Sequence, residues 1–438
     1  MSNLRKILLF SGDILIFYFS LFLALIISFW KDFTWKIFLE HFLPFSILYF
    51  FWLIIFYIFE IYNLSLFSKV SILYNRILIS LVFALFLGIT FFYLIPFFGI
   101  SPKTNLLLII IIFGVLLLAW RKLFHSLFPS SYFQNKVAFV GNKNPYAEEL
   151  ALIIQKNPYL GYKLITFLNS KDDIFKKIKE EKIDTLILTE NFISNPQLVK
   201  NLYQCFSLKI NFIDLAQFFE IIYEKIPISF INQIWFLENL KEGKKIFYEK
   251  LKRIIDILLS SLILIFSFPL WPFIILAIKL EDKGSLFYKQ KRIGKEKKPF
   301  FLIKFRSMKE GAEKETGAVW AEEEDSRVTK VGRILRRIHL DEIPQMFNVL
   351  KGDISLVGPR AERLEFIQQL EKEIPYYYLR HLIKPGFTGW AQIKFGYARS
   401  ITDSYEKFQY DLFYLKNRSL ILDFQILLKT FQLFFKKQ

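Results

Sequence analysis

The N-terminal part of the chain alternates long apolar runs with short polar loops. The runs lie at about residues 7–30, 42–62, 77–98 and 106–120. A helix needs about 20 apolar residues to cross a bilayer, and the first three runs reach that length. The fourth is shorter but continues beyond Arg121 and Lys122 through two more apolar residues. The pattern predicts four transmembrane helices within residues 1–128.

Positive charge is unevenly distributed among the loops of this predicted bundle. It gathers before the first run, between the second and third, and after the fourth, at Arg5, Lys6, Lys69, Arg76, Arg121 and Lys122. Because cytoplasmic loops carry the excess of Lys and Arg, both ends of the bundle are expected in the cytoplasm. Asp13 and Glu60 are almost the only ionisable residues inside the bundle. Their scarcity argues against an ion pathway and favours an anchor or interaction module.

A soluble pattern of alternating strands and helices follows at about residues 133–240. Short β-rich runs occupy 137–141, 162–168, 183–188 and 210–213, and the first helical pattern covers 147–156. Such alternation predicts a small doubly wound, Rossmann-like domain. The first turn, Gly141-Asn142-Lys143-Asn144-Pro145, lacks the second and third glycines of a dinucleotide fingerprint. A structural or regulatory domain without a cofactor is therefore favoured.

A fifth apolar run, about residues 254–280, has basic residues on both sides, at Lys250, Lys252, Arg253, Lys279 and Lys283. Hydropathy alone would make it a fifth spanning helix. Basic flanks at both ends disfavour crossing, however, and Pro269 and Pro272 break the helix near its middle. The sequence predicts a re-entrant helix at about 250–280, with Lys252 and Arg253 meeting lipid phosphates at the interface.

The last part of the chain is mostly polar and basic over residues 284–418 and ends in an apolar and basic pattern over 420–437. The terminal pattern fits an amphipathic helix lying in the membrane interface. A helix packed on the domain core fits equally well.

Composition supports membrane association. The 438 residues are 53% hydrophobic, which is too apolar for an ordinary soluble protein. The net charge is nevertheless +18, which favours anionic lipid headgroups and phosphorylated substrates as partners. Nucleic acid is not expected, because no helix-turn-helix, zinc or RNA-binding pattern occurs. The single Cys205 excludes an internal disulfide framework, and its apolar surroundings suggest that it is buried.

Two adjacent acids, Asp341 and Glu342, provide the clearest candidate chemistry. Arg336 and Arg337 precede them, and Arg360 follows a Gly-Pro turn downstream. An aspartate in such surroundings could ligate a metal or attack phosphorus directly. Attack by one anion on another requires a divalent ion and arginines to offset the repulsion. Taken alone, however, acids among arginines are more often a surface ion-pair network.

Further motifs surround the acidic pair in a fixed order. They are Phe287–Gly294, Lys304–Met308, Val357–Arg360, Lys384–Gln392 and Tyr410–Ser419. With the acidic pair they resemble the bacterial sugar transferase family, the monotopic polyprenyl-phosphate phosphoglycosyl transferases. The resemblance covers about residues 245–429, and the stretch at 394–397 is most similar to members from exopolysaccharide clusters. The order of helices, Rossmann-like domain and catalytic region resembles the large members of the family.

The resemblance implies a fold and a reaction. The expected fold is a four-helix transmembrane bundle, a Rossmann-like α/β domain, and a mainly helical monotopic catalytic domain at 246–438. The expected reaction transfers a sugar-1-phosphate from a UDP-sugar to undecaprenyl phosphate and releases UMP. It would start glycan assembly at the cytoplasmic face of a bacterial inner membrane, with a homodimer suggested by the large members.

The same resemblance implies roles for individual residues. Asp341 would be the nucleophile, and Glu342 would orient it or ligate the required Mg²⁺. The substrate phosphates would be bound by Arg336, Arg360, Lys304 and Arg306. The sequence departs from the family pattern at Ala361, His339 and Phe268, none of which removes a presumed catalytic group.

Several neighbouring residues have simpler interpretations. Gly358, Gly386 and Gly389 are expected to form turns that shape the site, and Trp390 is expected to be a packed aromatic residue. Two other functions are weighed. A membrane-anchored nucleotide-sugar dehydratase or epimerase would need the missing glycine fingerprint. A non-enzymatic scaffold or length regulator for polysaccharide assembly is the other, a role that the N-terminal half could serve in addition to catalysis. The transferred sugar is left open.

Overall fold

The computed structural model describes residues 2–64, 66, 70–94, 103–129, 134–142, 144–169, 172–189, 196–240, 245–282, 284–309, 311–312, 327–396 and 400–433. Predictions that fall on Lys69, Lys143, Lys283, Tyr397 and residues 434–437 lie outside this part. The chain divides into two compact units, Met1–Phe218 and Phe219–Gln438, which are described separately.

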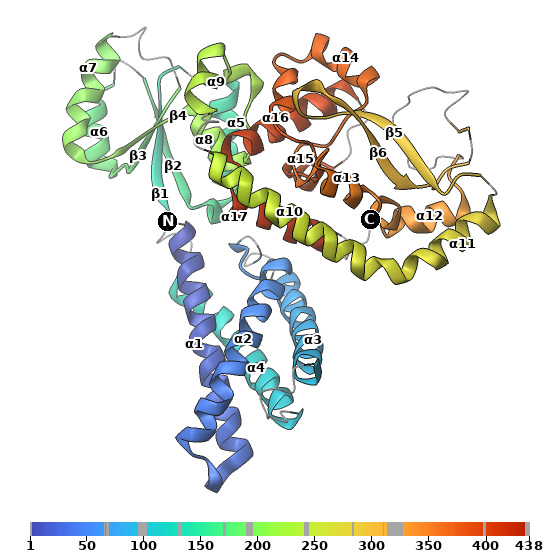
Figure 1. Ribbon diagram of the computed structural model, residues 1–438. Coiled ribbons are helices and arrows are strands. Elements are labelled where there is room, and N and C mark those ends of the chain that lie inside the picture. Colours follow the sequence, from blue (N-terminus) through green and yellow to red (C-terminus); the bar gives the residue numbers. More distant parts are fainter. Residues whose placement is uncertain are drawn as a thin grey trace. The chain divides into compact units, whose positions relative to one another are not determined.

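The first unit begins with four long apolar helices (Figure 1). They are α1 (Ser2–Phe29), α2 (Trp35–Ile58), α3 (Val70–Leu94) and α4 (Lys103–Leu127). Each is long and apolar enough to cross a membrane, which confirms the predicted four-helix pattern. Their shared core is rich in aromatic rings, among them Phe17 stacked on Tyr49 at a centroid distance of 3.8 Å.

One ion pair is enclosed within this bundle. Both guanidinium Nη atoms of Arg121 donate to the Asp13 carboxylate at 2.7 Å, and the two side chains are 1% and 0% exposed. Arg121 therefore lies inside α4 and neutralises an acid of α1, whereas the sequence pattern assigns it to the segment after the fourth helix. A charge in apolar surroundings needs such a partner, so the pair ties the first helix to the fourth.

The remainder of the first unit is an α/β domain with a four-stranded parallel sheet in the order β2-β1-β3-β4. The strands are β1 (Asn135–Val140), β2 (Tyr162–Leu168), β3 (Thr185–Leu188) and β4 (Asn211–Asp214). The helices are α5 (Pro145–Lys156), α6 (Ile174–Glu181) and α7 (Pro196–Cys205). Strands and helices alternate as predicted, and Cys205 is buried.

The second unit begins within α8 (Leu215–Tyr223) and continues through α9 (Gln233–Asn239). Ile226, Ile228 and Ile231 belong to the same apolar core as the helices that follow. The structure thus groups residues 219–240 with the C-terminal unit, whereas the sequence pattern assigns them to the α/β domain.

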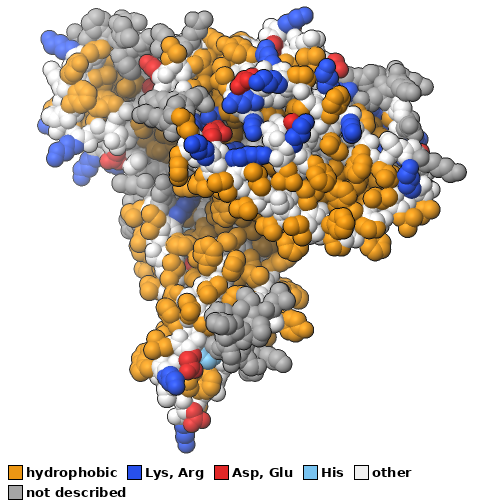
Figure 2. Space-filling model, in the orientation of Figure 1, with side chains coloured by type: hydrophobic (Ala, Val, Ile, Leu, Met, Phe, Trp, Pro, Cys, Tyr) orange, Lys and Arg blue, Asp and Glu red, His pale blue; other side chains and the backbone are white. Residues whose placement is uncertain are grey.

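The fifth apolar run forms α10 (Ile246–Ser267) and α11 (Trp271–Glu281), joined by a 3-10 turn at Phe268–Leu270. The chain bends there (Figure 1), with Pro269 in the turn and Pro272 in the first turn of α11. Hydrophobic side chains gather over these two helices (Figure 2). Exposed members include Ile254, Leu258, Ile265, Phe266, Phe273 and Leu280. By length and composition this segment also qualifies as a membrane span.

The remaining elements assemble two small sheets and several helices. The antiparallel hairpin contains β5 (Phe287–Ile293) and β6 (Pro299–Phe305), and the parallel pair contains β7 (Ser355–Val357) and β8 (Gly386–Thr388). The helices are α12 (Lys330–Arg337), α13 (Gln345–Lys351), α14 (Leu364–Glu373), α15 (Trp390–Lys394), α16 (Ile401–Asn417) and α17 (Leu420–Leu433).

Gly386 and Gly389, which were predicted to form turns, instead allow two backbone segments to approach each other closely. A Cβ on Gly386 would lie 2.1 Å from the backbone nitrogen of Gly358, and one on Gly389 would lie 2.2 Å from the Gly358 carbonyl oxygen. Gly386 lies in β8, and Gly389 precedes α15. Side chains at these positions would push apart the segments that carry β7 and β8.

The terminal helix α17 has features of both predicted alternatives. Ile426 and Leu422 are buried in the core of the second unit, whereas Ile421 and Phe424 are exposed. One face of α17 therefore packs on the domain, and the other presents apolar side chains.

Candidate active site

The two candidate acids lie in a 3-10 turn, Leu340–Glu342, between α12 and α13. His339, just before the turn, has a left-handed backbone with φ of 54°. Histidine adopts this conformation more readily than most residues, and here it reverses the chain after α12. The turn packs against β6, which carries Lys304. Asp341 and Glu342 are thus held by rigid elements on both sides.

Glu342 is neutralised by two cations. It forms an ion pair with Lys304 of the hairpin, and the Arg360 Nη2 atom lies 3.4 Å from the same carboxylate oxygen. Burial disfavours the charged form, but Lys304 and Arg360 outweigh it and hold the pKa of Glu342 well below its usual range. Glu342 is therefore a fixed anion that holds two phosphate-binding candidates in place.

Asp341 has different surroundings. It is 5% exposed, and within the described part of the chain its carboxylate makes no hydrogen bond or ion pair. Burial raises the pKa of Asp341. The positive charge of nearby Lys304 lowers this pKa, and the negative charge of Glu342 raises it further. A buried carboxylate without a hydrogen bond or ion pair among the described residues is costly, and a cation or an electrophile could reduce that cost.

The other two predicted phosphate ligands, Arg336 and Arg306, have different surroundings. The Arg336 Nε atom donates to the Ser307 hydroxyl at 2.9 Å, and its charge also acts on Asp341. Arg306 is buried and faces Asp282, with its Nη2 atom 2.8 Å from the Asp282 carbonyl oxygen and 3.4 Å from its carboxylate. The described contacts therefore join Lys304 and Arg360 to the acidic pair, and join Arg306 to the end of α11.

The two residues predicted at the lipid interface both have protein acceptors. The Lys252 ammonium donates to the Asp423 carboxylate at 2.6 Å and to the Tyr414 hydroxyl at 3.3 Å. The Arg253 guanidinium donates to the carbonyl oxygens of Val349 and Leu350, both at 2.5 Å. Arg253 thereby caps the C-terminal end of α13, where a positive charge is favourable. Their contact with lipid phosphates remains a prediction.

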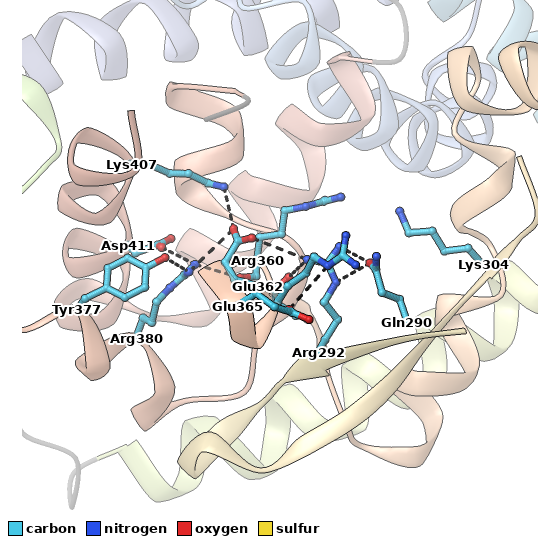
Figure 3. A network of polar contacts seen from close by, with 12 residues as sticks. Gln290, Arg292, Lys304, Arg360, Glu362, Glu365, Tyr377, Arg380, Lys407 and Asp411 are labelled. Atoms are coloured by element: carbon cyan, nitrogen blue, oxygen red, sulfur yellow. Dashed lines mark hydrogen bonds and ion pairs between the residues drawn. The ribbon is translucent and has the colours of Figure 1, made fainter. Parts of the chain in front are cut away.

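A buried polar network that the sequence did not predict lies beside Arg360 (Figure 3). Arg380 donates to the Asp411 carboxylate at 2.9 Å and to the backbone oxygen of Arg360 at 3.0 Å. Glu362 lies 3.4 Å from Lys407 and 3.9 Å from Arg380. The network therefore fixes the backbone that carries Arg360. No spacing in the sequence joins these residues, since they come from separate elements.

A divalent cation would find few protein ligands here. Among the described residues no group of three His, Cys, Asp or Glu side chains is placed to hold a metal. Mg²⁺ is commonly held by one or two carboxylates together with substrate phosphates. Asp341, whose carboxylate has no ion-pair partner within the described ranges, fits that mode, and Glu342 is adjacent but already paired. The residues present thus suit a metal that arrives with a phosphorylated substrate.

Comparison with known proteins identifies this region. The family model described as "Bacterial sugar transferase" matches residues 247–437. The "UDP-N-acetylgalactosamine-undecaprenyl-phosphate N-acetylgalactosaminephosphotransferase" of Aeromonas hydrophila is 44% identical over 183 residues, which is 42% of this chain and 43% of that protein. The "UDP-glucose:undecaprenyl-phosphate glucose-1-phosphate transferase" of Escherichia coli (strain K12) is 44% identical over 184 residues, 41% and 39% of the two chains.

A shorter relative is covered more completely. The "Uncharacterized sugar transferase EpsL" of Bacillus subtilis (strain 168) is 38% identical over 181 residues, which is 41% of this chain and 85% of that protein. The chain therefore belongs to the bacterial sugar transferase family. Its match spans about two fifths of the length of the Aeromonas and Escherichia relatives. The shared part is the C-terminal unit, which contains Asp341 and Glu342.

Proposed function

We propose that this membrane protein transfers a sugar-1-phosphate from a UDP-sugar to undecaprenyl phosphate, releasing UMP and starting the assembly of a polysaccharide. The observation that carries the proposal is the contrast between the two acids. Asp341 is buried without a hydrogen bond or ion pair among the described residues, whereas Glu342 is paired with Lys304 and Arg360. This contrast lies inside the region that matches the family. The names of two relatives describe the same reaction class.

The first half of the reaction forms a covalent intermediate. A carboxylate oxygen of Asp341 attacks the sugar-linked phosphorus, and the bond from that phosphorus to the oxygen of UMP breaks. UMP leaves with the bonding electron pair, and an aspartyl phosphosugar remains. In the second half a phosphate oxygen of undecaprenyl phosphate attacks the same phosphorus and releases the Asp341 carboxylate. Neither half requires net proton transfer.

The surrounding charges make the attack possible. Lys304 and Arg360 lie beside Glu342 and supply positive charge next to the nucleophile, and Arg336 adds to it. Arg306 is a more remote contributor, since it is bound to Asp282. Asp341, with Glu342 adjacent, would hold Mg²⁺, which when bound offsets the negative charge of the substrate phosphates.

The membrane arrangement belongs to the same proposal. The bend at Pro269 and the basic residues on both flanks support a re-entrant α10–α11 segment that keeps the site at the cytoplasmic face of the bacterial inner membrane. There a water-soluble UDP-sugar and a lipid-bound acceptor could meet. A homodimer is proposed by resemblance to the large family members.

A UMP-release assay tests the proposal. Purified protein with undecaprenyl phosphate and Mg²⁺ is given a panel of UDP-sugars, including UDP-glucose and UDP-N-acetylgalactosamine, which the relatives' names contain. The wild-type protein should release UMP from at least one of them, and Asp341→Asn should release none above background. Glu365→Gln, which changes a side chain that is 63% exposed, is the matched control and should behave as wild type. Full activity of Asp341→Asn would refute the mechanism.

A further inference from the structure

Gln345 follows the acidic pair by one helical turn. It is the first residue of α13. The two residues between the pair and Gln345 keep right-handed helical backbone angles, with φ and ψ of −52° and −41° at Ile343 and −61° and −15° at Pro344. Residues four apart on a helical path share one face. Gln345 and Asp341 are therefore presented from the same side of the turn.

The Nε2 group of Gln345 has no hydrogen-bond partner among the described residues. The residue is 4% exposed, and its Nε2 atom is fully enclosed without a hydrogen bond. No contact within the described residues supplies an acceptor for it. Native proteins pair nearly all buried amide groups, so an unpaired one next to a reactive carboxylate calls for an explanation.

Gln345 borders a small cavity of about 10 Å³, close to the room that one oxygen-sized group needs. The cavity is lined by Arg292, Leu302, Gln345, Ile354, Arg360, Ala361 and Gly386. Two of these residues carry guanidinium groups and none carries a carboxylate. Arg360, which lines the cavity, also lies 3.4 Å from Glu342, so one residue borders both the cavity and the charged site. Its electrostatics favour an anionic oxygen.

We propose that Gln345 binds the donor substrate directly, by donating a hydrogen bond from Nε2 to a phosphoryl oxygen of the UDP-sugar in this cavity. The inference rests on the proposed function and adds a substrate-binding residue to it. A neutral amide suits this position, because it can orient a phosphoryl oxygen without drawing the negative charge of Asp341 away from the phosphorus. Arg360 supplies the charge on the other side of the same oxygen.

The test uses the full-length protein in detergent and UDP as the probe, which contains both phosphoryl groups and needs no knowledge of the sugar. Gln345→Met preserves length and removes the donor. Its UDP affinity should fall about 10- to 100-fold, the loss expected for one hydrogen bond to a charged acceptor. Its thermal stability without ligand should rise, because an unpaired buried amide has been removed.

A second variant and a control sharpen the result. Gln345→Glu can pair with Arg360 in the free protein and should also lose UDP affinity, because its charge repels phosphate. Gln409→Met is the control: Gln409 is 5% exposed but its Nε2 atom donates to Glu406 at 2.8 Å. That variant should lose stability and keep its UDP affinity.

Three results would overturn the inference. The first is a Gln345→Met protein that binds UDP as tightly as wild type. The second is a loss of stability like that of Gln409→Met, which would mean that the amide is satisfied within the protein or by a fixed water. A substitution that spares UDP affinity and slows only the step with undecaprenyl phosphate would assign the oxygen to the acceptor and also contradict the inference. The proposed function fails separately, if the wild-type protein releases no UMP from any UDP-sugar.

Discussion

Asp341 and Glu342 are adjacent in one turn, yet neutralising them should change stability in opposite directions. Asp341→Asn removes a buried charge that has no ion-pair partner in the part of the chain that the structure describes. The free energy of unfolding of the ligand-free protein should rise by about 0.5–2 kcal/mol, the usual range for a stabilising substitution. Glu342→Gln instead removes the carboxylate that pairs with Lys304 and Arg360.

The loss in Glu342→Gln can be bounded from the exposure of the three side chains. Removing one member of a fully buried ion pair costs about 3–5 kcal/mol. Glu342 is 13% exposed, but Lys304 and Arg360 are 20% and 27% exposed, so water compensates part of the loss. We expect about 2–3 kcal/mol. For a unit of this size that corresponds to a melting temperature lower by about 4–12 °C.

The stability differences of Asp341→Asn and Glu342→Gln from wild type both depend on pH. The folded pKa of Glu342 lies below its usual 4.5, so its stabilisation is complete above about pH 4.5 and is lost as the pH falls further. The folded pKa of Asp341 lies above its usual 3.8, so its penalty is absent in acid and develops as the pH rises through that folded pKa. Both differences from wild type should therefore shrink toward low pH.

Thermal unfolding in one detergent, followed from neutral pH to pH 3, measures these differences. Glu365→Gln serves as the control, because its carboxylate is 63% exposed and should have little effect. The reasoning fails if Asp341→Asn and Glu342→Gln shift the melting temperature in the same direction at neutral pH. It also fails if the Glu342→Gln difference is unchanged at acidic pH.

Two further predictions concern the parts that support the site. Arg380→Met should lower the free energy of unfolding, measured with denaturant, by about 3–5 kcal/mol, because it removes the guanidinium that pairs with buried Asp411. A change below about 1 kcal/mol would contradict the role of the network. A chain of residues 219–438 should keep UMP release, whereas 241–438 should aggregate or unfold, because it loses core residues such as Ile226. Equal behaviour of the two truncations in expression and assay would contradict the grouping of residues 219–240 with the C-terminal unit.

The regular elements were predictable because their signals are local. Each candidate transmembrane helix is a long apolar run, and each strand of the α/β domain is a short β-rich run beside a helical pattern. The break at Pro269 was also local, because proline cannot continue the hydrogen bonding of a helix. The C-terminal limit of the α/β domain was less visible, since apolar residues at 226–231 do not indicate which core they join.

The pairings of charged residues could not be read from the sequence. Arg121 finds Asp13, and Lys252 finds Asp423, across more than a hundred residues in each case. A basic residue next to an apolar run was therefore interpreted as a loop or interfacial charge, although tertiary packing gives it a buried acid. The same limit applies to Arg306, which was grouped with the phosphate ligands and pairs with Asp282.

The acidic pair shows what the structure adds to a motif. Sequence alone placed Asp341 and Glu342 together and gave them different roles only through resemblance to a family. The structure gives them different surroundings, with Glu342 held by two cations and Asp341 left without a partner among the described residues. Gln345 follows the pair by one helical turn, but nothing in that spacing indicates that its Nε2 group is buried and without a hydrogen bond among the described residues.

The central claim is that Asp341 forms a covalent bond to the phosphosugar, and mass spectrometry of the trapped intermediate tests it most directly. The protein is incubated with the active UDP-sugar and Mg²⁺ without undecaprenyl phosphate, then acid-quenched and digested. A sugar-phosphate adduct should appear on the peptide at Asp341 and be absent from Asp341→Asn. Release of UMP without any adduct on the wild-type peptide, or an adduct that persists in Asp341→Asn, would contradict the account.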